Sequence, residues 1–350
     1  MRFYSDNTAT ACAEVLDAIR AANTGHVKAY GDDEWTQRLD AVFSRFFGTP
    51  VSAFALSTGT AANSLSLATV CPPYGAIFAH EEAHIVRDEC AAPEFFSGGA
   101  RVVTITGAHG KLSPDALAAA IDANPATVHT PQPAAVSLTQ ATELGTVYRP
   151  DELGALCALA HDRGLKVHLD GARLANAIAF LECEPREIAA TGIDVLSFGA
   201  TKNGALSAEA AVFFDRNLVR DFELRRKRAG HLLSKSRYVA AQLLAYIETE
   251  VWLRNARRAN ALARQLAAAA GTALLHPVEA NEVFVHLGDA GKSRLRGQGF
   301  EFYDWGPLAA GEARFVVSWD QREADVTALC AALSALPSRG TETAHRPMRT

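Results

Sequence analysis

Short apolar runs alternate with helical patterns through the middle of the chain. The segment 150–163 opens with Pro-Asp-Glu and is followed by Gly164, which are the start and stop signals of a helix. Strands that alternate with helices predict a mostly parallel sheet covered on both faces, so we expect an α/β fold. The predicted strands are 76–79, 101–105, 135–138, 166–170, 194–198 and 210–214.

The pattern changes after residue 218. A long, arginine-rich helical stretch runs over 218–270, and it is followed by short strands and a closing helix that predict a smaller α+β domain. The last residues lack apolar periodicity, which is typical of a disordered tail. The predicted small-domain elements are strands 282–287, 300–304 and 314–319 and a helix over 322–336. The expected division is an N-terminal segment packing with the small domain (1–25), a large domain (26–250), the small domain (251–336) and the tail (337–350).

Composition narrows the class of protein. With 350 residues and 49% hydrophobic content, the chain can bury one large core and one smaller core. A net charge of −5 gives no electrostatic basis for binding nucleic acid or an anionic membrane surface. The six cysteines show no CxxC pair or metal-like spacing, and neither a secretory signal nor a membrane-spanning run is visible. We therefore expect reduced thiols, no metal centre and a cytoplasmic location.

Lys202 raises the first chemical question, because it ends the apolar run LSFGATKNG at 196–204. A buried ammonium must be paired or lose its charge, and an uncharged lysine is a nucleophilic amine. Asp170 ends another predicted strand, where its carboxylate either caps a helix or faces a ligand cation. Together they suit pyridoxal phosphate (PLP), since the lysine forms an imine and the acid keeps the pyridine nitrogen protonated.

A phosphate site is the third requirement for this cofactor. The stretch STGTAAN at 57–63 follows an apolar run and opens a helical pattern. Small and hydroxyl residues at a helix N-terminus leave backbone N–H groups free, and the helix dipole favours an anion. Alone, such a turn also serves as an ordinary cap. In combination with Lys202 and Asp170, it indicates the cofactor's phosphate.

The sequence resembles the low-specificity L-threonine aldolases, which are fold-type-I PLP enzymes, and within them the bacterial branch that includes L-phenylserine aldolase. The likeness covers about residues 3–335. It implies a PLP-dependent transferase-like fold and retro-aldol cleavage of L-β-hydroxy-α-amino acids, such as L-threonine, L-allo-threonine and L-phenylserine, to glycine and an aldehyde. The matching stretches are SDN (5–7), YGDDEWT (30–36), STGTAAN (57–63), DECAAPEFFSGGA (88–100), TQATELGTVY (139–148), HLDGARLANA (168–177), LSFGATKNG (196–204) and RRKRAGH (225–231).

The resemblance also implies roles for single residues. Those implied in catalysis are the Schiff-base Lys202, Asp170, the ring-stacking His84, and His129 near the substrate hydroxyl. Those implied in cofactor binding are Lys202, Asp170, Thr58, Gly59, Thr60, His84, Arg173 and Lys227. Those implied in substrate binding are Ser5, Arg173, Arg314, His129 and Tyr30. The family's usual assembly is a homotetramer of dimers with shared active sites, in which Lys227 and Tyr30 would reach a neighbouring subunit.

Several alternatives stay open at this level. Another PLP reaction, such as β-elimination or transamination, would use the same cofactor site, and so would a PLP-fold protein that binds without turnover. A dinucleotide-binding oxidoreductase is disfavoured because no GxGxxG turn lies at the right place. His168 alternates with apolar residues beside Asp170 and is interpreted either as a packing residue or as one that supports the site residues without touching a ligand. The catalytic base (His84, His129 or a water molecule), the preferred β-substituent and the threo/erythro selectivity are left undecided.

Overall fold

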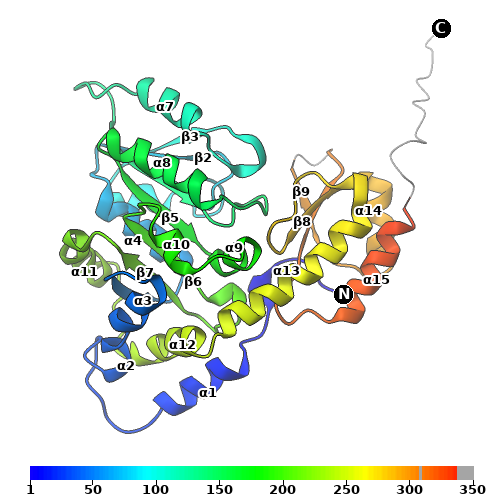
Figure 1. Cartoon of the computed structure of the whole chain (residues 1–350), viewed down its shortest axis with the longest axis horizontal. Coiled ribbons are helices and arrows are strands. Elements are labelled where there is room, and N and C mark those ends of the chain that lie inside the picture. Colours follow the sequence, from blue (N-terminus) through cyan, green and yellow to red (C-terminus); the bar gives the residue numbers. More distant parts are fainter. Residues whose placement is uncertain (307–309, 337–350) are drawn as a thin grey trace.

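The computed structural model describes residues 1–306 and 310–336 and has two lobes (Figure 1). The larger lobe contains a seven-stranded sheet with the order β1-β7-β6-β5-β4-β2-β3. The four pairings among β2 to β6 are parallel, and β7 runs antiparallel to both of its neighbours. The predicted mostly parallel sheet is therefore confirmed. Its strands are β1 (Ser52–Leu56), β2 (Gly75–His80), β3 (Arg101–Ile105), β4 (Gln132–Thr139), β5 (Lys166–Gly171), β6 (Val195–Gly199) and β7 (Glu209–Phe213).

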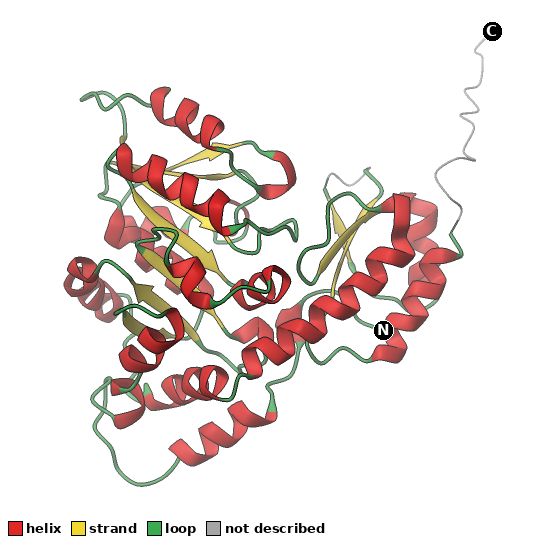
Figure 2. Cartoon of the chain, in the orientation of Figure 1, coloured by secondary structure: helices red, strands yellow, loops and turns green. Residues whose placement is uncertain are grey.

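Helices cover both faces of this sheet (Figure 2). One face packs on α3 (Leu39–Phe47), α7 (Pro114–Asp122), α8 (Pro150–Asp162), α9 (Leu174–Leu181), α10 (Pro185–Ala189) and α12 (Arg237–Glu248). The other face packs on α4 (Gly59–Val70), α6 (Ala92–Ser97) and α11 (Val219–Arg228). The remaining short or peripheral helices of this lobe are α1 (Ala13–Ala22), α2 (Glu34–Gln37) and α5 (His84–Arg87).

The arginine-rich stretch is three helices rather than one long element. Gly230 (φ +80°) follows α11, and Glu250 (φ +58°) precedes α13 (Val251–Ala270). Backbone with positive φ cannot continue an α-helix, so the chain turns at these points. The apolar run at 51–55 was predicted only as a lead-in to the phosphate turn, but it forms the edge strand β1.

The smaller lobe is built on an antiparallel sheet of order β8-β10-β9. Phe3 joins its core: Phe3 N donates to Glu301 O (2.8 Å), and Val316 N donates to Phe3 O (2.9 Å). By contrast, α1 packs against α12 of the larger lobe. The domain boundaries stay predictions, and the tail prediction for 337–350 lies outside the described residues. The elements are β8 (Glu282–His286), α14 (Gly288–Gly297), β9 (Tyr303–Trp305), β10 (Glu312–Val316) and α15 (Glu323–Ser334), beside α13.

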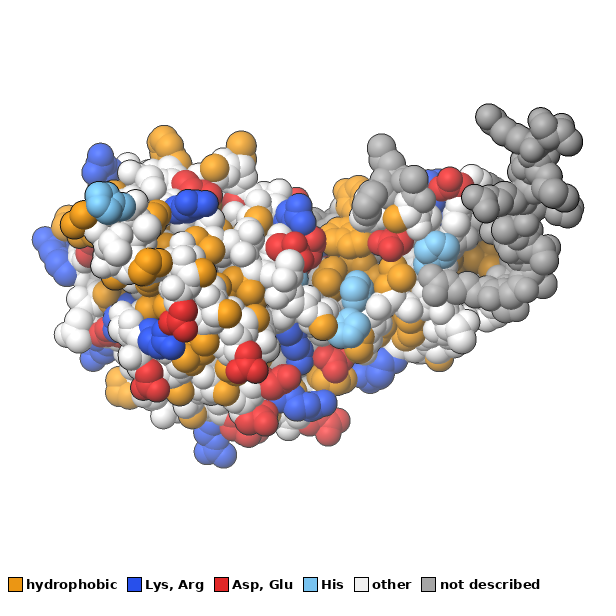
Figure 3. Space-filling model, turned by 90° about the horizontal axis from the view of Figure 1, so that it is seen from above, with side chains coloured by type: hydrophobic (Ala, Val, Ile, Leu, Met, Phe, Trp, Pro, Cys, Tyr) orange, Lys and Arg blue, Asp and Glu red, His pale blue; other side chains and the backbone are white. Residues whose placement is uncertain are grey.

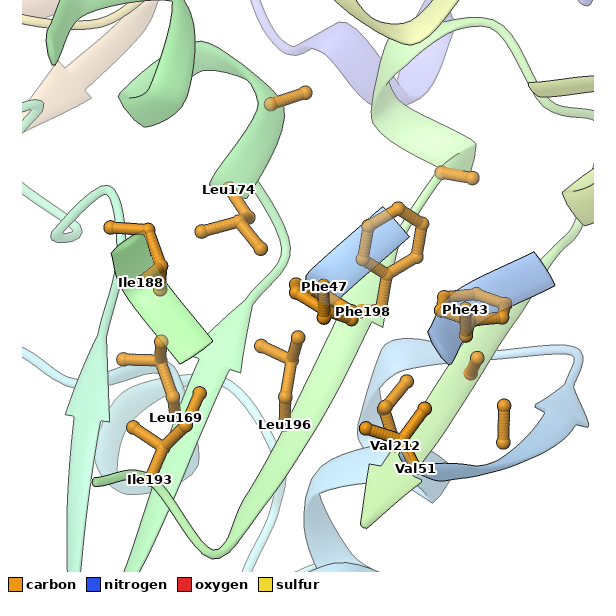
Figure 4. Packing of buried hydrophobic residues seen from close by; sticks show 14 of the residues in the cluster. Phe43, Phe47, Val51, Leu169, Leu174, Ile188, Ile193, Leu196, Phe198 and Val212 are labelled. Carbon is orange, nitrogen blue, oxygen red and sulfur yellow. The ribbon is translucent and has the colours of Figure 1, made fainter. Parts of the chain in front are cut away.

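An aromatic cluster holds α3 against the sheet (Figure 4), and Tyr246 of α12 also contacts it. Phe198 of β6 is 2% exposed, and its ring meets those of Phe43 and Tyr246 edge-on at 5.1 and 6.1 Å. Such rings bury a large apolar area, and edge-to-face pairs add about 1 kcal/mol each. This packing fixes the strand that leads directly into Lys202.

On the face that Figure 3 shows, basic and acidic side chains are interspersed. All six cysteines are free, and burial raises the pKa of Cys71 and Cys157 to about 12. Within the described ranges, every helix lacks the combination of length and apolarity that crossing a bilayer demands.

Replacing Phe198 with alanine should lower the free energy of unfolding by about 3–5 kcal/mol, because it opens a cavity between β6, α3 and α12. Urea denaturation measures this change. Phe95→Ala is the matched control: its ring is 77% exposed, so its effect should stay within about 0.5 kcal/mol. Equal losses in the two variants would contradict the packing described.

Candidate active site

A cavity of about 270 Å³ lies beyond the carboxyl ends of the parallel strands. Lys202 and Asp170 reach it from the ends of β6 and β5, which are neighbouring strands. Six of the residues assigned from sequence meet there: Thr58, Gly59, Thr60, His84, Asp170 and Lys202. The other lining residues are Asn7, Ser57, Asn63, Ala172, Ser197, Thr201 and Glu209.

The N-terminus of α4 forms one end of the cavity. Thr58 is the N-cap, and its hydroxyl accepts a hydrogen bond from Ala61 N at 3.2 Å. A Cβ added at Gly59 would meet no atom within 4 Å, so open space lies in front of the helix. The first N–H groups of a helix and its dipole favour an anion at such a place. This end of the cavity fits the phosphate of PLP.

Asp170 is held by two donors. Its Oδ2 accepts from Asn63 Nδ2 at 2.8 Å, and its Oδ1 accepts from Ala172 N at 3.0 Å. The side chain is nearly fully buried but still lines the cavity. A fixed carboxylate at this position fits the partner of a protonated pyridine nitrogen. Sequence reasoning quoted Asn63 within STGTAAN but assigned it no role.

His84 is held in its protonated form. Burial opposes the charge, but the hydrogen bond from Nδ1 to Glu89 (2.7 Å) and the charges of Asp170 and Glu143 outweigh it and raise the pKa of His84 to about 9. At neutral pH this imidazolium can donate a proton or a hydrogen bond, but it has no free site to accept a proton. Its chemistry in the cavity is that of a cationic donor.

His84, Glu89 and Asp170 also have the composition of a metal-binding cluster, since their ligand atoms lie within 4.8 Å of one another. Hydrogen bonds already link the three side chains, directly or through Asn63. The 2.7 Å contact of His84 with Glu89 is a hydrogen bond, and Asn63 Nδ2 donates to both carboxylates. A hydrogen-bonded network therefore accounts for the cluster.

Side-chain hydrogen bonds hold the turn that carries Lys202. Asn203 Nδ2 donates to the Tyr246 hydroxyl (2.6 Å) and to Trp252 O (2.8 Å). Gly204 has φ +116°, and a Cβ there would come within 2.7 Å of Asn255 Nδ2, so only glycine fits. These contacts fix the backbone directly after the lysine.

Glu209 of β7 is a buried acid in the same cavity, and sequence reasoning missed it. It lies opposite Leu56 of β1 and Gly199 of β6 in the sheet. Burial raises the pKa of Glu209 to about 7, although Thr201 and Lys202 act in the opposite direction. This carboxyl can therefore gain or lose a proton close to neutral pH.

Arg173 and Arg314 meet at the junction of the two lobes, outside the cavity lining. Arg173 makes two hydrogen bonds to Asp6, at 2.8 and 2.9 Å, and lies 3.3 Å from Glu282. Arg314 lies 3.7 Å from the same Glu282 and stacks over Trp305 at 4.9 Å. The two assigned arginines therefore share one buried acid.

Ser5, Tyr30 and Lys227 lie outside the cavity lining as well. The Ser5 hydroxyl accepts from Asn7 N at 3.2 Å, and Asn7 itself lines the cavity. Tyr30 and Lys227 are exposed and contact each other, with the ammonium 4.5 Å from the ring centre. They form a surface pair.

His129 is not brought to the cavity of its own chain. It lies exposed in the turn before β4, whereas Thr139 at the far end of β4 pairs with Asp170. An eight-residue strand is about 26 Å long, so the histidine lies at the opposite edge of the sheet. The role of His129 near the substrate hydroxyl stays a prediction, and with this geometry it would require another copy of the chain.

The fold and the lysine, carboxylate and helix N-terminus around this cavity define a fold-type-I PLP-dependent enzyme. The chain belongs to the beta-eliminating lyase family, whose model matches residues 2–290.

Similar proteins agree with this class. Two curated relatives are named low specificity L-threonine aldolase. One, from a Pseudomonas species, is 44% identical and covers 96% of this chain and 98% of its own length. The other, from Pseudomonas aeruginosa, is 46% identical, and the match covers 91% of this chain and 93% of the relative's length. The threonine aldolase structure from Leishmania major matches with a TM-score of 0.89 at 26% sequence identity. The match covers 95% of this chain and 98% of the Leishmania chain.

Replacing Asp6 with asparagine should lower the free energy of unfolding by about 3–5 kcal/mol, because Arg173 keeps a buried charge without its main partner. Burial raises the pKa of Asp6, but Arg173 outweighs it and lowers the pKa from 3.8 to about 2. The pair therefore stabilises the fold above pH 3.8 and loses this contribution as the pH falls through about 2. Urea denaturation of both proteins at pH 7 measures the loss.

Asp17→Asn is the control for this substitution, since Asp17 pairs with Arg20 at an exposed position. We expect a change of less than about 1 kcal/mol there. A similarly small loss in Asp6→Asn would show that the buried pair does not support the fold.

Proposed function

We propose that this chain is a PLP-dependent aldehyde-lyase that cleaves L-β-hydroxy-α-amino acids to glycine and an aldehyde. The observation that carries the proposal is the single cavity that joins Lys202, Asp170 and the N-terminus of α4. The two Pseudomonas relatives, at 44% and 46% identity over nearly their full length, support cleavage of threonine-type substrates in particular.

The cofactor would be held by residues that line the cavity. The Lys202 amine would form the imine with the cofactor, Asp170 would pair with the pyridine nitrogen, and the turn from Thr58 to Thr60 would bind the phosphate. His84, which lines the cavity from α5, would stack on the cofactor ring. The bound cofactor supplies an electron sink that stabilises the electron pair left on Cα when the Cα–Cβ bond breaks.

The substrate carboxylate would be bound at the lobe junction by Arg314, with Arg173 and Ser5 beside it. Arg314 Nε is buried and lacks a hydrogen-bond partner in the described part of the chain, which supports a role in ligand binding. Arg173 is already engaged by Asp6, so it is better suited to orienting its neighbours. A bidentate arginine grip on a carboxylate also fixes the orientation of the reacting carbon.

We also propose that the active form is a cytoplasmic homotetramer, a dimer of dimers with shared active sites. Tyr30 and Lys227 form an exposed pair suited to reaching a neighbour's cofactor phosphate. Val128, beside His129, is 95% exposed, as expected of a turn that another copy covers.

The further assignment to the phenylserine branch rests on the motif likeness. It predicts cleavage of L-threo-phenylserine as well as L-threonine and L-allo-threonine, which steady-state rates on the three substrates test.

The competing PLP reactions differ in their products. β-Elimination or transamination would release a keto acid, accompanied by ammonia in the case of elimination, whereas the aldolase yields only glycine and an aldehyde. A PLP-fold protein without turnover would fail to join glycine and benzaldehyde in the reverse direction. Product analysis therefore separates all three alternatives.

Replacing Lys202 with alanine should abolish the absorbance of the lysine-bound cofactor and reduce turnover to background, because no other amine lines the cavity in the described part of the chain. Absorbance spectra and an aldehyde-release assay measure both effects. Lys166→Ala is the control: Lys166 starts the neighbouring strand β5 and pairs with Asp194 and Asp215 at the opposite edge. Retained absorbance and turnover in Lys202→Ala would reject the assignment.

A further inference from the structure

The end of the cavity that fits the cofactor phosphate also contains an acid. Glu209 of β7 lies opposite Leu56 of β1 in the sheet, and the phosphate turn at 58–60 begins two residues after Leu56. Ser207 ties the same two segments together, because its hydroxyl donates to Ser57 O at 2.7 Å. Glu209 and the turn line one cavity, so a phosphate bound at the turn shares that cavity with a carboxyl group.

Glu209 is held in place by the backbone that precedes Lys202. Thr201 N donates to Glu209 Oε1 at 3.4 Å, and only 7% of the glutamate is exposed. No lysine or arginine within residues 1–306 and 310–336 forms an ion pair with its carboxyl. A negative charge on Glu209 would therefore be buried in the cavity without a directly paired cation.

The titratable groups around Glu209 come from the elements packed against it. Segment 52–60, which contains β1 and the phosphate turn, has no titratable side chain. Burial raises the pKa of Glu209 to about 7, although Thr201 and Lys202 act to lower it. The surrounding titratable groups are Lys202 after β6, Asp170 of β5, His84 of α5 and Tyr246 of α12.

A phosphate group in this cavity changes the balance for Glu209. A phosphate monoester carries about 1.5 to 2 negative charges at pH 7, so an ionised carboxylate in the same cavity would repel it. A protonated carboxyl is instead an O–H donor, and phosphate oxygens are strong acceptors. Phosphate binding therefore favours the protonated form of Glu209.

We propose that Glu209 binds the phosphate of PLP as a neutral carboxylic acid, so that cofactor binding takes up a proton from solvent. This inference deepens the proposed function and rests on its cofactor. The carboxyl O–H donates to a phosphate oxygen, while Oε1 keeps its hydrogen bond from Thr201 N. The proton comes from solvent and returns to it when the cofactor leaves, so protons and charge balance. Affinity for the phosphate is highest below about pH 7 and falls as the pH rises.

Pyridoxal, which lacks the phosphate, isolates this contact, because its reaction with Lys202 is the same as that of PLP. In wild type, the preference for PLP over pyridoxal should fall about tenfold or more from about pH 6.5 to about pH 8.5. Glu209→Gln donates from its side-chain amide at every pH, so its preference should change by less than about threefold over this range. Absorbance titrations of cofactor-free protein with each compound measure both dissociation constants.

Proton uptake gives a second, independent readout. Calorimetry in two buffers of different ionisation enthalpy counts the protons that accompany PLP binding. At about pH 7.5, wild type should take up about half a proton more than Glu209→Gln does. Glu223→Gln is the matched control, since this glutamate is exposed on α11 and pairs with Arg220. The control should match wild type in both measurements.

The outcomes separate this inference from the function on which it rests. If wild type binds PLP but releases no aldehyde from any β-hydroxy-amino acid, the proposed function fails while the proton uptake still tests Glu209. If wild type cleaves, and its pH dependence and proton uptake equal those of Glu209→Gln, only the inference is overturned. Equal weakening of PLP and pyridoxal binding in Glu209→Gln would also overturn it, because the residue would then support the cavity rather than the phosphate.

Discussion

The amide of Asn63 joins the charged groups on which the cavity depends. Its Nδ2 donates to Asp170 at 2.8 Å and to Glu89 at 2.7 Å, and Glu89 in turn holds the proton of His84. Two buried carboxylates this close would repel each other strongly without these donors. Asn63 lies four residues after Gly59 on α4, about 6 Å along the helix axis. One helix therefore positions both the phosphate turn and the support of Asp170.

The sheet explains why the main site residues could be predicted. Lys202 and Asp170 each follow an apolar strand, and the carboxyl ends of parallel strands meet at one edge. The phosphate turn likewise has a local signal, since small and hydroxyl residues open a helix. Each of these signals lies within a few residues of the functional group. The six predicted strands and the helix at 150–163 were found for the same reason.

The features that sequence reasoning missed depend on contacts between distant segments. Glu209 looks like an ordinary acid until β7 places it in the cavity that Lys202 also lines. The antiparallel direction of β7 had an unused signal: the connection 200–208 is too short for the crossover helix that a parallel pair requires. The position of His129 had an unused signal as well. His129 precedes its strand, whereas the cavity lies where the parallel strands end.

The titratable groups in and near the cavity differ in proton affinity, and the difference separates fixed charges from groups that titrate. Arg173 is paired with Asp6, and His84 keeps its proton through Glu89, so both act as fixed positive charges. Burial raises the pKa of Glu209 to about 7. A bound phosphate would add negative charge beside α4, and a proton on Glu209 would lessen the repulsion. Glu209 can therefore gain or lose a proton near neutral pH, while His84 and Arg173 stay charged.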